Sequence, residues 1–152
     1  MALIWHSGLN TGIDVIDQQH QRIGECINNL ELAIVGEDRE LLNAVFEELM
    51  DYTLSHLAFE EAMMVEAGYP LATAHKAVHE QFARRIERYR QKHLAGEDVA
   101  LQLHRTLNAW LIHHIKRDDM AYVPVVSARL QEKLRDARPD GWLNRMLRQV
   151  FA

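Results

Sequence analysis

Histidine is the residue type most able to do chemistry in this 152-residue chain. There are nine histidines, against four phenylalanines and four tyrosines. Burying several imidazoles in one small core would leave ring nitrogens without partners, at a cost of about 1–3 kcal/mol for each. A shared metal centre would remove that cost. Five histidines fall on apolar faces of segments with helical periodicity: His20, His56, His75, His79 and His114.

Two carboxylates have spacings that would bring them to those histidines. Glu60 follows His56 by four residues, so both side chains leave the same face of a helix. Asp119 follows His114 by five residues, a looser spacing that requires a helix end or a π-type bulge. Five imidazoles and two carboxylates are too many ligands for one tetrahedral zinc. They suit two octahedral metal ions, and the mixed ligand set favours iron.

Other catalytic motifs are absent from the sequence. There is no His-Glu-x-x-His, no Glu-x-x-His of the carboxylate-rich di-iron oxidases, and no glycine-rich phosphate loop. The single cysteine, Cys26, lies inside a predicted helix and forms no internal disulfide, which makes a Cys–His hydrolase an unfavourable interpretation.

The candidate ligands must be positioned by helices. Apolar residues recur at spacings of three and four over residues 14–35, 38–67, 73–94 and 98–121, and we expect Pro124 to limit the last of these helices. Short connections between four such helices predict an all-α, up-down-up-down four-helix bundle over residues 1–126. In this prediction an N-terminal arm carrying Trp5 covers one end.

The remaining residues, 127–152, form a predicted C-terminal helical extension. A turn at 138–141 precedes apolar residues at helical spacing, so we expect an amphipathic helix packed on or beside the bundle. Residues 129–152 hold six Lys and Arg against three Asp and Glu. We expect a monomer, with a dimer or a protein partner bound through residues 129–152 as the alternative.

Charge and hydropathy exclude several classes of partner. The net charge of −5 argues against nucleic acid. No uncharged apolar stretch approaches the length of a membrane span. The first six residues lack a basic region followed by an apolar run, so we expect no signal peptide and a cytoplasmic location.

The motifs around these seven residues resemble those of the hemerythrin family, over about residues 5–126. They are Gly12-Ile13-Asp14-x-Ile16-Asp17-x-Gln19-His20, His56-x-x-x-Glu60-Glu61-x-Met63, His75-x-x-x-His79-x-x-Phe82 and Trp110-Leu111-x-x-His114-Ile115-x-x-x-Asp119. The resemblance implies a non-haem di-iron centre that binds O₂ reversibly, for oxygen carriage, storage or sensing.

The resemblance also implies how the ligands would be shared. His75, His79 and His114 would hold one iron, and His20 and His56 would hold the other. Glu60 and Asp119 would bridge the two irons, together with an oxo or hydroxo bridge. The iron with two histidines would then keep one free position, where O₂ would bind.

Reversible O₂ binding requires a dry, apolar pocket. The residues that we expect to line it are Ile23, Leu57, Phe59, Trp110, Leu111 and Ile115. The alternative is that all of them are simply core residues. By resemblance, Leu111 is the best choice for the residue over the free position.

We expect several other polar residues to lie outside the set of metal ligands. Glu61 and Asp118 are neighbours of ligands and are expected to face solvent. Asp17 is expected either to cap a helix or to orient an imidazole. The four remaining histidines, which we expect to lie away from the metals, are His6, His93, His104 and His113.

The sequence is compatible with two other functions. One is a di-iron enzyme, such as an oxidase, a peroxidase or a nitric oxide reductase. The other is a regulatory module that contacts a partner through its basic tail when the site changes redox state. The excess of histidine over carboxylate and the saturated first iron favour O₂ binding over O–O cleavage, so we expect no enzyme.

Overall fold

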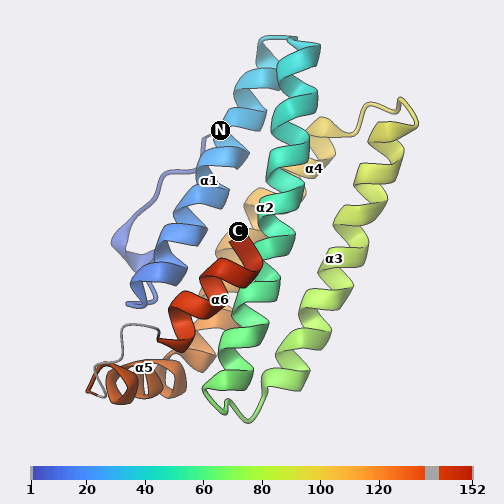
Figure 1. Cartoon of the computed structure of the whole chain (residues 1–152). Helices are drawn as coiled ribbons and strands as arrows, with labels where there is room; N and C mark the ends of the chain where they lie inside the picture. Colours follow the sequence, from blue (N-terminus) through green and yellow to red (C-terminus); the bar gives the residue numbers. More distant parts are fainter. Residues whose placement is uncertain (1, 136–140, 152) are drawn as a thin grey trace.

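The computed structural model describes residues 2–135 and 141–151. Over these residues all regular structure is helical, and no strand is present. Four long helices run antiparallel to their neighbours along the molecule (Figure 1). They are α1 (Asp14–Val35), α2 (Arg39–Glu66), α3 (Ala72–Leu94) and α4 (Ala100–His113). The predicted all-α four-helix bundle is therefore confirmed.

Local sequence explains where the helices begin and end. The Asp38 side chain accepts a hydrogen bond from the amide of Leu41, which caps the start of α2. Gly68 and Gly96 have φ angles of 72° and 89°, in the left-handed region that favours glycine, and each follows the end of a helix. These turns return the chain at once, so consecutive helices pack side by side.

The fourth helix continues well past its predicted end. After α4 the chain forms a π-helical turn, η2 (His114–Asp119), and then α5 (Met120–Arg135) with Pro124 inside it. The prediction that Pro124 limits the helix was wrong. The π turn and the proline together change the direction of the helix rather than end it, and the later part of α5 lies across one end of the bundle (Figure 1).

The N-terminal arm is fixed to α1 by side-chain hydrogen bonds. Asn28 both accepts from the amide of Leu3 and donates to its carbonyl, at 2.7 and 3.0 Å. The indole nitrogen of Trp5 donates to Asn10, and the Trp5 ring packs against the buried core. A short 3₁₀ turn, η1 (Ser7–Leu9), precedes α1.

The last helix, α6 (Trp142–Phe151), lies against α2 (Figure 1). Its Met146 side chain is buried, and the Phe151 ring contacts Tyr52 and Phe59 at centroid distances of 5.5 and 5.9 Å. The predicted turn at 138–141 lies outside the described residues except for Gly141. The boundary that we predict after residue 126 falls within α5.

The apolar core is divided into two clusters. The first, which we call the main cluster, includes Ile23, Ile27, Phe46, Leu57 and Leu107 and extends over most of the bundle. The second, which we call the end cluster, packs the other end of the bundle against α5 and α6. Its buried members are Ile13, Ile16, Phe59, Met63, Met64, Tyr69, Tyr122, Val126 and Met146.

Candidate metal centre

Each of the four bundle segments contributes side chains to one buried polar cluster. α1 supplies His20, α2 supplies His56 and Glu60, α3 supplies His75 and His79, and η2 supplies His114 and Asp119. None of the seven is more than 7% exposed. Their ligand atoms form two overlapping groups, each within 4.8 Å, that share Glu60, His114 and Asp119. The structure thus brings all seven predicted ligand residues together.

Glu60 directs its two oxygens to different histidines. Oε1 lies 3.2 Å from Nε2 of His56 and 3.4 Å from Nε2 of His20. Oε2 lies 3.3 Å from Nε2 of His79 and 3.2 Å from Nε2 of His114. One carboxylate therefore faces two sets of imidazoles from its two ends.

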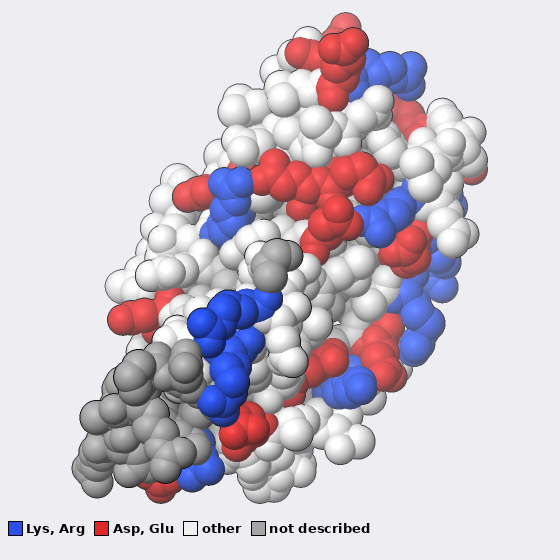
Figure 2. Space-filling model, in the orientation of Figure 1, with Lys and Arg blue, Asp and Glu red and all other residues white. Residues whose placement is uncertain are grey.

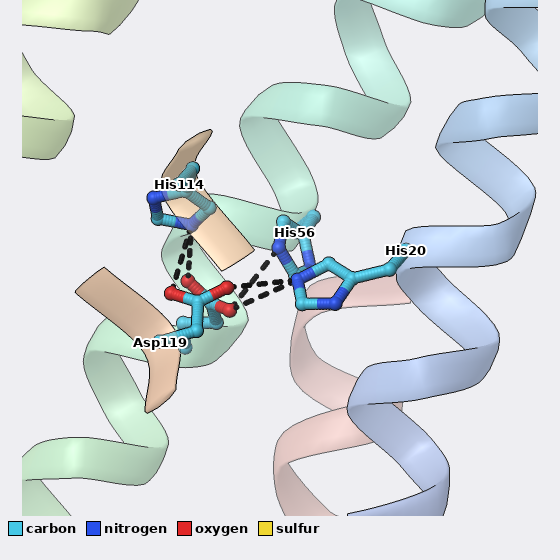
Figure 3. A group of neighbouring side chains, drawn as sticks. His20, His56, His114 and Asp119 are labelled. Atoms are coloured by element: carbon cyan, nitrogen blue, oxygen red, sulfur yellow. Dashed lines mark hydrogen bonds and ion pairs between the residues drawn. The ribbon is translucent and has the colours of Figure 1, made fainter. Parts of the chain in front are cut away.

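Asp119 divides its oxygens in the same way. Oδ2 lies 2.9 Å from Nε2 of His20, while Oδ1 lies 3.0 Å from His114 and 3.5 Å from His75. Figure 3 shows His20 and His56 to the right of this carboxylate and His114 above it. Both carboxylates are arranged as bridges between a pair of histidines and a set of three.

The π-helical turn explains how Asp119 reaches the cluster. Hydrogen bonds in a π-helix join residues five apart, so residues i and i+5 stand on one face. His114 and Asp119 are the two ends of η2. The sequence left a helix end and a π-type bulge open as explanations of the five-residue spacing. The structure has the π-type turn, which brings both side chains to one face.

The polar atoms that face the centre of the cluster are suited to holding cations. Nε2 of His20, His56, His75 and His79 and both oxygens of Asp119 are buried without a hydrogen-bond partner of good geometry. Buried polar atoms are seldom left unpaired, because each costs free energy. Imidazole nitrogens and carboxylate oxygens are ligands for iron and other first-row metals, so the donors present fit such ions.

Charge within the cluster favours ionised carboxylates. Burial raises the pKa of Glu60, but the neighbouring His56 and His114 outweigh it and hold the pKa well below its ordinary value. For His114, burial lowers the pKa, yet Asp119 and Glu60 leave it well above the usual range. Burial lowers the pKa of His56. The site stabilises positive charge close to its two carboxylates, which is what a cation site requires.

Outer hydrogen bonds orient three of the imidazoles. Nδ1 of His56 bonds to Oε1 of Gln19 at 2.8 Å, and Nδ1 of His79 lies 3.2 Å from Glu61. Nδ1 of His114 lies 3.4 Å from Asp118. An acceptor on Nδ1 keeps the proton there and turns Nε2 inward as a ligand.

The prediction for Glu61 and Asp118 was wrong, and the structure decides against one of the two alternatives for Asp17. Glu61 and Asp118 do not simply face solvent, because each accepts from a ligand histidine while remaining partly exposed. The four-residue spacing from His114 to Asp118 was the signal that could have shown one of them.

Asp17 does not orient an imidazole. It accepts hydrogen bonds from Thr11 and from the amide of Gly12, so it fixes the loop before α1.

Tyr122 is a site residue that the sequence did not indicate. It is fully buried in α5, and its hydroxyl donates a 3.0 Å hydrogen bond to Oε1 of Glu60. It lies beyond the predicted end of the fourth helix, so no helical spacing connected it to the ligands. The Trp5 ring, 6.5 Å from that of His20, was likewise assigned only to the end of the bundle.

The six predicted pocket residues fall in different places. Ile23, Leu57, Leu111 and Ile115 are buried in the main cluster. Phe59 belongs to the end cluster and contacts Phe151. Trp110 is partly exposed and stacks on His114 and Phe82.

The four other histidines lie away from the cluster. His6 accepts from the amide of Gly8, His93 stacks on Phe46 with centroids 4.1 Å apart, and His113 is exposed. His104 is buried, with Nε2 3.9 Å from Glu31 of α1.

Fold and site together define a helical bundle that holds a buried histidine–carboxylate cluster for cations, and comparison with known proteins agrees. The family model described as "Hemerythrin HHE cation binding domain" matches residues 11–126. The chain therefore belongs to the hemerythrin family.

Several relatives within that family are similar over most of the chain. Bacteriohemerythrins of Stenotrophomonas maltophilia and Pseudomonas aeruginosa are each 48% identical over 149 residues, which is 98% of this chain and 97% of theirs. That of Methylococcus capsulatus is 31% identical over 131 residues, covering 84% of this chain and 100% of its own. A crystal structure of wild-type hemerythrin superposes with a TM-score of 0.79 at 28% identity, over 84% of this chain and 99% of that one.

None of the described helices is both long enough and apolar enough to span a membrane.

Proposed function

We propose that this chain binds two iron ions and uses them to bind O₂ reversibly, as an oxygen carrier, store or sensor. The observation that carries the proposal is the division of the Glu60 and Asp119 oxygens between two groups of histidines. A carboxylate whose oxygens face different imidazoles fits two neighbouring ions rather than one. His75, His79 and His114 would hold one ion, and His20 and His56 the other.

The ligand count indicates where O₂ would bind. Three histidines and two carboxylate oxygens, with one oxo or hydroxo bridge, give six ligands to the first ion. Two histidines, with the same oxygens and bridge, give five to the second. The free position therefore lies on the side of His20 and His56. When bound, the iron pair would supply the two electrons that hold O₂ and return on its release.

The protein's own contribution is to orient the ligands and to exclude water. Gln19, Glu61 and Asp118 fix three imidazoles through Nδ1. We expect the main cluster to cover the side of His20. Ile23 follows His20 by one helical turn, and the Trp5 ring, which packs against that cluster, lies 6.5 Å from the His20 ring. Dry surroundings of this kind slow the loss of electrons to solvent and so support reversible binding.

We propose that the O₂ pocket is lined mainly by residues of the main cluster: Ile23, Leu57, Leu111 and Ile115. Phe59 would close the site from the end cluster. Trp110 would border the half of the site that holds His114, because the two rings are stacked. Reversible binding of O₂ in such an apolar pocket converts no substrate. We therefore propose that the chain is not an enzyme.

The decisive experiment measures iron and O₂ on the same sample. Purified protein is reduced without oxygen, its iron per chain is determined, and O₂ is admitted and removed while the visible spectrum is recorded. We expect two irons per chain and an absorption band that appears and disappears with O₂. Zinc in place of iron, or irreversible oxidation in the first cycle, would contradict the proposal. His56→Ala should abolish the band, and His113→Ala, an exposed histidine, should retain it.

Location, oligomeric state and the two alternative functions are each tested by a separate measurement. We propose a cytoplasmic monomer, which cell fractionation and light scattering would test. Steady consumption of O₂, peroxide or nitric oxide with an added reductant would instead indicate a di-iron enzyme. Loss of a co-purifying protein on deleting residues 129–152 would indicate the regulatory alternative.

A further inference from the structure

Trp110 connects the protein surface with one of the proposed iron ligands. Its ring stacks on His114, with centroids 4.5 Å apart and planes 14° apart, and on Phe82 at 3.9 Å and 2°. The indole is partly exposed, whereas His114 is fully buried. Stacked rings at these distances are in van der Waals contact. The indole therefore forms an unbroken π contact from solvent to the imidazole.

A surface hollow lies over this stack. It has a volume of about 490 Å³, and its lining includes Phe82, Arg85, Trp110, Arg117 and Asp118. Asp118 is also the hydrogen-bond partner of His114 Nδ1. Two residues of the hollow thus contact His114 directly, one by stacking and one by a hydrogen bond.

Two arginines and one aspartate line the hollow, so its formal charge is positive although the chain as a whole is negative. Arg85 of α3 and Arg117 of η2 are both exposed and have no ion-pair partner among the described residues. Lys116, next to Arg117, is exposed as well. Along the edge formed by α3, Figure 2 shows Lys and Arg side chains with Asp and Glu among them, so the unpaired charge is that of the hollow itself. Uncompensated positive charge of this kind attracts an acidic surface and orients it during encounter.

The stack also indicates the kind of molecule that could use this route. Because Phe82 and His114 cover both faces of the indole, a planar small molecule cannot stack on Trp110. Only the indole edge is accessible, and the charges that surround it come from two separate elements. This arrangement fits a protein surface laid over the hollow rather than a small ligand inserted into it.

We propose that this hollow, which we call the entry face, docks an acidic one-electron donor protein and that Trp110 passes its electrons to the iron pair through His114. The inference rests on the proposed function, because an iron pair that has lost its electrons must be reduced before it binds O₂ again. Each donor loses one electron and converts one Fe³⁺ to Fe²⁺. Two successive transfers restore the ferrous pair, and no bond forms or breaks in Trp110.

The test uses a flavodoxin as the acidic donor and the oxidised, iron-loaded protein as acceptor. Oxidised flavodoxin gives the dissociation constant by titration calorimetry at low and high salt. Flavodoxin hydroquinone, mixed under stopped flow without oxygen, gives the limiting rate of its conversion to the semiquinone. We expect binding that weakens with salt and a transfer rate that saturates with donor concentration.

Variants separate docking from transfer. Arg85→Gln combined with Arg117→Gln should weaken binding roughly tenfold at low salt and leave the limiting rate unchanged. Trp110→Leu should slow the limiting rate about tenfold with unchanged affinity, and Trp110→Phe should recover part of it. Arg39→Gln is the matched control. Arg39 is exposed like Arg85 and Arg117, but it lies near the turn at Gly96 and is not part of the entry face.

The possible failures are distinguishable. Absence of salt-dependent flavodoxin binding, or wild-type affinity in the arginine variant, would overturn the docking surface. A wild-type limiting rate in Trp110→Leu would overturn the route through the indole. Each variant is also reduced chemically with dithionite and exposed to O₂. Failure of the wild-type protein to bind O₂ after that reduction would refute the proposed function, whatever the donor does.

Discussion

The hydroxyl of Tyr122 donates a hydrogen bond to the Glu60 oxygen that faces His20 and His56. Burial raises the pKa of Tyr122 well above its ordinary value, and Glu60 and Asp119 raise it further. The phenol therefore keeps its proton at neutral pH and remains a donor. It fixes one end of a carboxylate that is arranged as a bridge.

Removing that hydroxyl should loosen the bridge without creating a cavity. Tyr122→Phe keeps the ring and leaves Oε1 of Glu60 without this donor, at a cost of about 1–3 kcal/mol. We expect weaker iron retention, measured by the rate of iron loss to a chelator. Tyr89→Phe is the control, since the Tyr89 hydroxyl bonds to Thr106 outside the metal site. Equal rates in both variants would show that the bond to Glu60 has no role at the site.

The outer acceptors should affect metal affinity although they are not ligands. Glu61→Gln and Asp118→Asn remove the charge that holds Nδ1 of His79 and His114, and such changes typically cost about 10–100-fold in metal affinity. Competition with a chromophoric chelator measures the effect. Glu80→Gln, an exposed neighbour of His79, should behave like the wild type. Wild-type affinity in both acceptor variants would contradict the orienting role.

The lining of the proposed O₂ pocket predicts how fast the site loses electrons. Leu111 is fully buried, so Leu111→Ala should destabilise the fold by about 2–5 kcal/mol. The space left would admit water to the site. We expect a faster decay of the O₂-bound spectrum to the oxidised one. Leu101→Ala, about half exposed on the same helix, is the control. A decay no faster than that of Leu101→Ala would place the pocket elsewhere.

The lone cysteine should be unreactive in the folded protein. Burial, with a further contribution from Glu48, raises the pKa of the Cys26 thiol from 9.0 to about 11. At pH 8 the thiolate fraction would be on the order of 10⁻³, so alkylation by iodoacetamide should be about 100-fold slower than in the unfolded chain.

The same shift has a consequence for stability. Because the folded pKa is the higher one, the stabilisation from the neutral thiol is complete below pH 9 and is lost as the pH rises towards 11. Denaturant titrations of wild type and Cys26→Ala across that range should converge as the pH rises. Rapid labelling at pH 8 would show that Cys26 is accessible and that the pKa of its thiol is not raised.

The sequence predicted much of the metal site because helical geometry is periodic. A spacing of four residues fixes the shared face of His56 with Glu60 and of His75 with His79, whatever surrounds them. The same reasoning narrowed the segment between His114 and Asp119 to a helix end or a π-type bulge, since residues five apart do not share a face of an ordinary α-helix. Ligand residues were therefore accessible from local rules. The end of the fourth helix was not, because the chain stays helical through Pro124.

The contacts between segments were decided by the tertiary structure. Tyr122 reaches Glu60 across 62 positions of sequence, and it does so because the chain remains helical through Pro124. Which oxygen of Glu60 faces which imidazole, and the stacking of Trp110 between Phe82 and His114, likewise depend on how separate helices pack. The sequence by itself determined which residues could be ligands and on which helix faces they stand. Only packing determined the outer hydrogen-bond partners of the ligands and the stacking of the partly exposed Trp110 on His114. The distances between these side chains are set by rotations and shifts between helices that no local spacing encodes.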